Sequence, residues 1–92
     1  MNNNWTQKGI DIYGEAMNDY SGWSVSLSSD GLTLAIGAIN NDGNGDNSGH
    51  VKVYEWVNNL WTPKGITIYG DGSNDQSGWS VSLSSDGSIL AI

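Results

Sequence analysis

The sequence predicts an all-β chain built from tandem repeats. Residues 5–36 match residues 61–92 without a gap, at an offset of 56 residues and with eight differences in 32 positions. Inside each copy, large apolar residues alternate with serine, which is the two-residue period of a strand. The composition agrees, because 13 glycines and only 14% charged residues suit short strands and turns better than exposed helices. A unit used twice indicates architecture more strongly than a local pattern does.

The first two strands are expected over residues 23–28 and 34–39. The first alternates Trp, Val and Leu with serine. Ser29-Asp30-Gly31 follows, and Asp-Gly between two apolar strands predicts a hairpin with a type I′ turn. The second strand is apolar on both faces, which is typical of a strand between two packed layers.

The third and fourth strands are expected over residues 50–57 and 61–69, after a polar loop at 40–49. The third strand places its valines on one face and His50, Lys52, Tyr54 and Trp56 on the other. Pro63 lies in the fourth strand. Because proline cannot donate to a ladder, this strand is expected at the outer edge of the sheet.

Four antiparallel strands per 56-residue repeat describe the blade of a β-propeller. A solenoid coil is shorter, about 20–30 residues, whereas a β-sandwich stays possible without explaining a copied unit. The expected division is one repeat module over 1–92. Residues 1–20 form the outer strand of a preceding blade, 21–76 a complete blade, and 77–92 the first two strands of the next. The second repeat lacks the equivalents of 37–56, so the chain is expected to be a partial propeller that either oligomerises or belongs to a longer array.

The string Ser21-Gly22-Trp23-Ser24-Val25-Ser26-Leu27, with Ser29-Asp30-Gly31, Leu34-Ala35-Ile36-Gly37-Ala38 and Gly49-His50-Val51-Lys52-Val53-Tyr54, resembles the FG-GAP repeat of integrin-α-type β-propellers. Ile39 stands where that family usually has proline. The resemblance is strongest to bacterial secreted or surface versions. It implies a propeller of several blades, a role in adhesion or protein binding, and an extracellular or cell-surface location. Family members often bind calcium between their first two strands, but Ser28–Gly31 is too short to offer several oxygens.

A metal site has one candidate. Asp42, Asn44 and Asp46 offer oxygen side chains at alternate positions, a spacing that opens many calcium loops. Asn47 stands where an EF-hand needs glycine, and no bidentate glutamate follows. The alternative is a solvated turn, and no other cofactor is expected.

The chain is not expected to be an enzyme. His50 is the single histidine and there is no cysteine, so neither a triad nor a thiol nucleophile can be assembled. Asp19 and Asp75 recur in both copies with Glu15 and Asp71 nearby. A repeated carboxylate serves a turn more readily than catalysis.

Trp5 and Trp61 are candidates for ligand binding, because aromatic faces stack on sugars. The alternative is that both tryptophans pack between blades, and that Trp23 and Trp79 share a face with valine and leucine.

The expected function is therefore a non-enzymatic module for protein binding, adhesion or self-assembly into a multi-blade ring. The alternatives are a carbohydrate-binding propeller, or part of a larger secreted repeat protein without activity of its own. A net charge of −7 argues against nucleic acid as a partner. No apolar run is long enough to insert in a membrane, and Met1–Asn4 shows no secretory signal.

Overall fold

The computed structural model describes residues 5–92, which form seven strands and no helix. The strands are β1 (Ser21–Leu27), β2 (Thr33–Ala38), β3 (His50–Val57), β4 (Leu60–Pro63), β5 (Ile68–Tyr69), β6 (Ser82–Leu83) and β7 (Leu90–Ala91). The all-β prediction is confirmed.

The main sheet has the order β1-β2-β3-β4, with every pair antiparallel, as the repeat pattern predicts. The expected fourth strand over 61–69 is interrupted. β4 pairs with the end of β3 and β5 with its beginning, and residues 65–67 leave the ladder at Gly65, whose φ is +76°. Pro63 lies at the end of β4, on the outer edge as expected.

The turn between β1 and β2 is not type I′. Only Gly31 takes a positive φ, +74°, while Asp30 instead accepts hydrogen bonds from the Ser28 hydroxyl (2.7 Å) and the Leu32 amide (3.0 Å). The Gly31 amide donates to the Ser28 carbonyl at 2.9 Å. The aspartate thus organises a longer turn through its side chain.

The second repeat reproduces the first. β6 and β7 pair Ser82 with Ala91 and Leu83 with Leu90, the positions that correspond to Ser26–Ala35 and Leu27–Leu34 in β1 and β2. Left-handed backbone recurs at five equivalent pairs: Gly9 and Gly65, Asn18 and Asn74, Tyr20 and Gln76, Gly22 and Gly78, Gly31 and Gly87. The 56-residue offset is therefore an offset in conformation as well as in sequence.

The expectation of an outer strand within residues 1–20 is wrong for residues 5–20, which form no strand; residues 1–4 lie outside the described residues. A strand needs a neighbour for its hydrogen bonds. The equivalent residues 61–63 pair with β3, whereas no strand in the described part of the chain pairs with residues 5–7.

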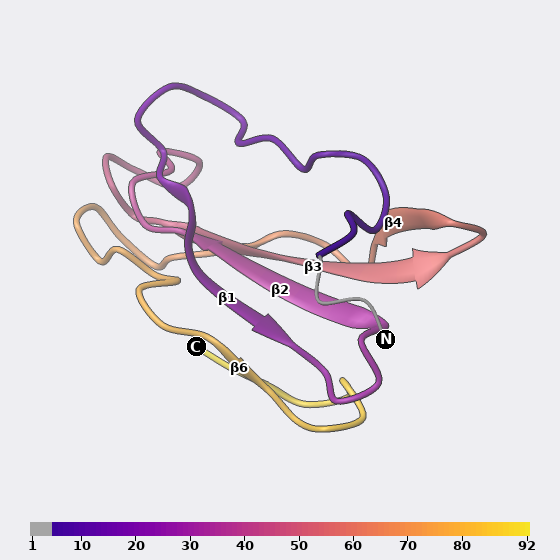
Figure 1. The fold of residues 1–92 in the computed structure, drawn as a ribbon. Helices are drawn as coiled ribbons and strands as arrows, with labels where there is room; N and C mark the ends of the chain where they lie inside the picture. The colour runs from indigo at the N-terminus through magenta and orange to yellow at the C-terminus, as the bar shows by residue number, and fades with distance from the viewer. Residues whose placement is uncertain (1–4) are drawn as a thin grey trace.

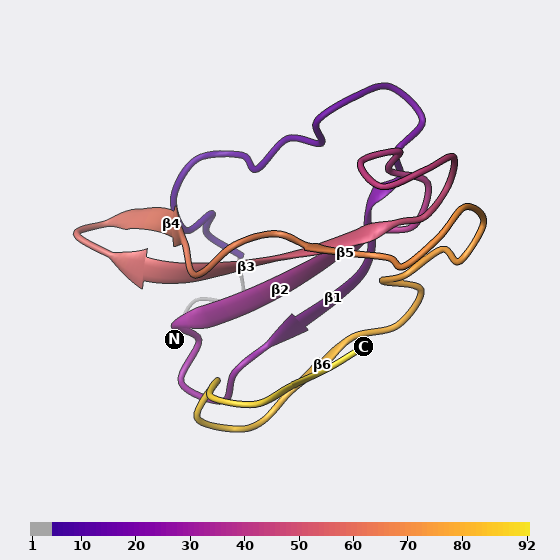
Figure 2. The same ribbon diagram turned by 180° about the vertical axis from the view of Figure 1, so that it is seen from behind.

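Residues 5–20 lie on one side of the main sheet and residues 77–92 on the other (Figures 1 and 2). We call the side toward 5–20 the A face and the side toward 77–92 the B face. Since partners in a ladder share a face, the A face carries Val25, Leu27, Leu34, Ile36 and Lys52, and the B face carries Ser24, Ser26, Ala35, Gly37 and Val51. The buried core consists of Ala35, Ile36, Ala38, Ile39 and Val51.

Candidate functional site

The contact between the two repeats is made by the B face of the main sheet. The Ser24 hydroxyl donates to the Gly78 carbonyl at 2.6 Å, and the Leu83 amide donates to the Ser26 hydroxyl at 3.0 Å. Gly37 lies so close to Gly78 that a Cβ on Gly37 would overlap the Gly78 carbonyl. The alternating serines and the glycine of the repeat therefore allow two backbones to approach closely.

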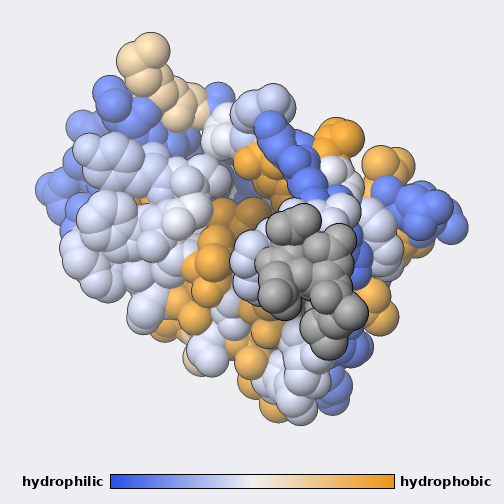
Figure 3. Space-filling view, in the orientation of Figure 1, coloured by the Kyte–Doolittle hydropathy of each residue, from blue (hydrophilic) through white to orange (hydrophobic). Residues whose placement is uncertain are grey.

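Each repeat presents its A face to the B face of the repeat before it. Val81 and Leu83, on the A face of the second repeat, are half-buried by the first, whereas the equivalent Val25 and Leu27 are 60% and 55% exposed. The B face shows the reverse, because Ala35 is fully buried and its equivalent Ala91 is exposed. The chain thus exposes the β1 part of one A face, at Val25 and Leu27, and the β7 part of one B face, at Ala91, and apolar surface reaches solvent across the middle of Figure 3.

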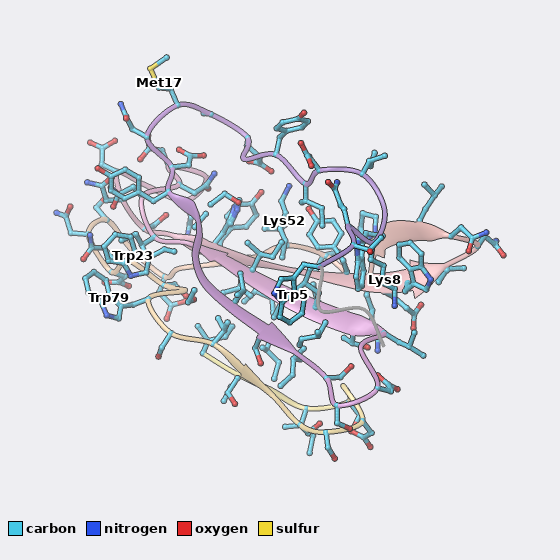
Figure 4. All side chains as sticks on the ribbon, in the orientation of Figure 1. Trp5, Lys8, Met17, Trp23, Lys52 and Trp79 are labelled. Carbon is cyan, nitrogen blue, oxygen red and sulfur yellow. The ribbon has the colours of Figure 1, made fainter. Side chains whose placement is uncertain are left out.

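The candidate ligand residues Trp5 and Trp61 occupy equivalent positions in unlike surroundings. Trp61 donates its ring N–H to the Lys8 carbonyl at 3.0 Å, and its ring meets Trp56 edge-on at 5.1 Å between centroids. The ammonium of Lys8 lies 4.8 Å from the Trp56 ring centroid, which is a cation–π contact. Trp5 is fully exposed and stands in front of the sheet in Figure 4. The structure does not bring the two tryptophans into one site.

Trp23 and Trp79 form an exposed aromatic pair, contrary to the expected position beside valine and leucine. A bulge between Ser21 and Ser24, with Gly22 at φ +88°, breaks the alternation of β1 and redirects Trp23. Its ring centroid lies 4.9 Å from that of Trp79 and 5.8 Å from that of Tyr20. Figure 4 shows both tryptophans at the same end of the molecule. The glycine before each tryptophan was the sequence signal for this bulge.

A polar cluster lies between residues 5–20 and the main sheet, and it includes the Glu15 and Asp19 carboxylates, for which the sequence favoured a role in a turn. The buried Asn41 amide donates to Asp19 at 2.9 Å and to Glu15 at 3.2 Å, and Glu15 forms an ion pair with Lys52. The hydrogen bond with Lys52 lowers the pKa of Glu15, and the same bond raises the pKa of Lys52. This network connects the 5–20 segment to β3, so Asp19 has a structural role here, as the turn-forming Asp75 does by accepting the Gly72 amide at 3.0 Å.

His50 lies at the start of β3 and is buried. Burial lowers the pKa of its imidazole, an effect that the nearby Glu15 carboxylate opposes. Its ring meets Tyr69 edge-on at 5.9 Å, and its Nδ1 finds no hydrogen-bond partner among the described residues. The imidazole therefore acts as a packing group between β3 and β5.

The calcium candidates in the 40–49 loop form hydrogen bonds with other groups of the protein. Asp42 accepts the Asn47 amide at 2.9 Å, and the Asn44 side chain donates to the Gly70 carbonyl at 2.8 Å. The Asp46 carbonyl accepts the Asn74 amide at 2.7 Å. Over residues 5–92, no three His, Cys, Asp or Glu side chains are grouped as a metal site would need. Calcium at Asp42, Asn44 and Asp46 stays a prediction.

Comparison with known proteins gives one family. The model of the FG-GAP repeat matches residues 14–54, which include β1, β2 and most of β3. No curated protein and no solved structure matches the chain significantly. The described residues contain no helix that is long and apolar enough to cross a membrane. The chain is therefore similar to the FG-GAP repeat over residues 14–54, and its antiparallel all-β sheets are consistent with a partial β-propeller.

Proposed function

We propose that this chain is a non-enzymatic repeat module that binds protein through its exposed A face. The surface that it binds is the B face of another repeat of the same kind. Head-to-tail self-association would then bury, between two chains, the same two kinds of surface that the two repeats bury against each other within one chain. An extracellular or cell-surface setting, as for adhesion modules, fits this proposal.

A single comparison carries the proposal: identical residues are covered in one repeat and uncovered in the other. Trp61, Val81 and Leu83 are each partly buried by the repeat before them, whereas Trp5, Val25 and Leu27 are not. Burying the remaining surface of Val25 and Leu27 would stabilise association by about 1–2 kcal/mol each. The contact joins two different surfaces, so it is heterologous and can add chains in one direction.

Two one-sided variants test the direction of assembly. Leu27→Arg blocks the A face, and Ala91→Arg blocks the B face of the second repeat. Both positions are exposed, so neither change should disturb the chain itself. In sedimentation velocity, the unaltered chain should associate and each variant alone should be a monomer. Their mixture should form a dimer through the one intact pair of surfaces.

Ile66→Ser is the matched control, because Ile66 is 89% exposed and its equivalent Ile10 is 73% exposed, so neither copy of this residue is buried by the other repeat. It removes apolar surface that neither face uses and should leave association unchanged. A monomeric unaltered chain at about 100 µM, or a mixture of the two arginine variants that stays monomeric, would contradict the proposal.

Glycan binding is the second candidate, and the exposed rings of Trp23 and Trp79 favour it. The two rings are 49% and 56% exposed and adjacent, so a sugar could stack on them as on other aromatic platforms. A glycan array should then give signals that Trp79→Ala removes and Trp5→Ala retains. Uniform silence of the array would exclude this function.

A further inference from the structure

Asn44 is followed by Gly45, and this is the one Asn-Gly step in the sequence. Because glycine carries no Cβ, its amide nitrogen can approach the side-chain carbon of the asparagine before it. Asparagine is a chemically labile residue, and a following glycine favours its conversion. Asn44 is also exposed to the water that the conversion consumes. The 40–49 loop thus carries a chemical reactivity that the proposed function does not use.

In the folded chain, hydrogen bonds engage both of the groups that would react. The Asn44 side-chain amide donates to the Gly70 carbonyl at 2.8 Å and to the Asp71 carbonyl at 3.3 Å. The Gly45 amide donates to the Asp42 carbonyl at 3.3 Å. The reaction needs the Gly45 nitrogen without its proton and directed at the Asn44 side-chain carbon. Both sets of hydrogen bonds must therefore open first, so the folded loop holds the reaction back.

The 40–49 loop packs on residues 70–77, the segment between β5 and β6. Three backbone amides of this segment donate to three successive carbonyls of the loop, in the pairs Asn74 to Asp46 (2.7 Å), Gln76 to Asn47 (3.0 Å) and Ser77 to Ser48 (2.9 Å). Gly45 lies so near the segment that an added Cβ would be 2.7 Å from the Ser73 hydroxyl. The Asn44 side chain adds its two hydrogen bonds to this contact.

We propose that Asn44 is a site of spontaneous deamidation, and that docking of the 40–49 loop on residues 70–77 controls the reaction. When the contact opens, the Gly45 nitrogen attacks the Asn44 side-chain carbon and forms a new C–N bond. The bond from that carbon to the side-chain nitrogen breaks, and this nitrogen leaves as ammonia with the proton that Gly45 has lost. One water molecule then opens the five-membered imide at either of its carbonyls. The product at position 44 is aspartate or isoaspartate, so an amide and water have become a carboxylic acid and ammonia.

Deamidation removes a hydrogen-bond donor and adds a negative charge. The carboxylate would have no proton for the Gly70 and Asp71 carbonyls, so oxygen would face oxygen where hydrogen bonds now form. Asp42 and Asp46 flank it two residues away on either side, in a chain whose net charge is already −7. The loop would then hold the segment that leads to β6 less tightly. Opening permits the reaction and the product favours opening, so the change runs in one direction.

The first test measures the rate of conversion at each asparagine of the full chain. The chain is incubated in mildly alkaline buffer, once folded and once in urea, and peptide mapping by mass spectrometry follows aspartate and isoaspartate. In urea, Asn44 should convert faster than Asn47, whose successor Ser48 carries a Cβ. In the folded chain, Asn44 should convert at least about tenfold more slowly than in urea. Equal rates at Asn44 and Asn47 in urea overturn the proposal, as do equal rates at Asn44 in the two conditions.

The second test uses Asn44→Asp, which reproduces one product, and measures amide hydrogen exchange. Exchange should become about tenfold faster at the amides that donate to the loop, while the β2–β3 ladder stays protected. These amides belong to Asn74, Gln76 and Ser77.

Asn47→Asp is the matched control for the added charge. Asn47 contacts the segment through its backbone carbonyl, and aspartate tolerates the left-handed backbone at this position, where φ is +55°. Its exchange rates should stay within about twofold of those of the unaltered chain. If Asn44→Asp leaves exchange unchanged, or if both variants accelerate it equally, the lost Asn44 donor does not control the contact and the proposal is wrong.

Discussion

Replacing Gly37 with alanine tests a close backbone contact between the repeats. Gly37 is buried in β2, and its φ lies outside the left-handed region, so alanine costs nothing in backbone strain. The added Cβ would overlap the Gly78 carbonyl and lie 2.8 Å from the Ser24 hydroxyl. The atoms it meets are largely backbone, so they cannot move aside as the end of a flexible side chain could.

The expected magnitude follows from two opposing effects. Overpacking costs about 1–3 kcal/mol. Replacing a glycine lowers the entropy of the unfolded chain, which raises the free energy of unfolding by about 0.4–1 kcal/mol. The net free energy of unfolding should fall by about 1–2 kcal/mol, which lowers Tm by about 5–15 °C in a chain of this size.

Gly72→Ala is the control. Gly72 has no positive φ, and the nearest atom to an added Cβ is a carboxylate oxygen of Asp75 at 3.9 Å. Thermal and urea unfolding followed by far-UV circular dichroism should show an unchanged or slightly raised Tm for Gly72→Ala. Near-UV dichroism adds a local readout, because the Trp23 and Trp79 rings lie 4.9 Å apart across the repeat contact. If Gly37→Ala is as stable as Gly72→Ala, the repeats do not pack through this contact.

Three further predictions concern the polar groups. Asn41→Ala leaves the buried Asp19 carboxylate without its amide donor, so urea unfolding should show a loss of about 1–3 kcal/mol. Burial lowers the pKa of His50 below its ordinary 6.5, so on acidification the unfolded chain binds this proton before the folded chain does. The free energy of unfolding should therefore fall as the pH drops through 6.5, and it should fall less in His50→Gln. Hydrogen bonds from Ser88 and Ser84 lower the pKa of Asp86 from 3.8 to about 2; the stability difference between the unaltered chain and Asp86→Ala should be complete above pH 4 and disappear toward pH 2. A difference that grows on acidification would refute this assignment.

The sequence repeat predicted much of the fold, because equal residues at equal offsets adopt equal local backbone. The turn at Gly31 recurs at Gly87 with the same φ of +74°, and the β6–β7 register copies that of β1–β2. The outer position of the strand that contains Pro63 followed from its missing N–H. Local chemistry determines these features, so a local pattern can reveal them.

The surroundings of identical residues could not be predicted in this way. Leu27 and Leu83 share the same neighbours in sequence, yet one is exposed and the other half-buried, because only one has a repeat packed over it. The contact between Asp19 and Asn41 joins residues 22 positions apart across two segments, and no spacing rule indicates it. The bulge at Gly22 interrupts the strict alternation of β1 before Trp23, so the alternating pattern alone could not indicate that this ring packs against Tyr20 and Trp79.

The side chains that separate successive repeats differ greatly in size along the sheet. Near β1 and β2 the spacers are serine and glycine, with Ser24 and Gly37 directly against Gly78. Near β4 they are tryptophans, with Trp56 and Trp61 held against Lys8. Each layer is consequently thinner near β1 and β2 than near β4, so it has the shape of a wedge. In the proposed assembly, layers of this shape would not stack in a straight column, and each added repeat would turn about an axis beside β1.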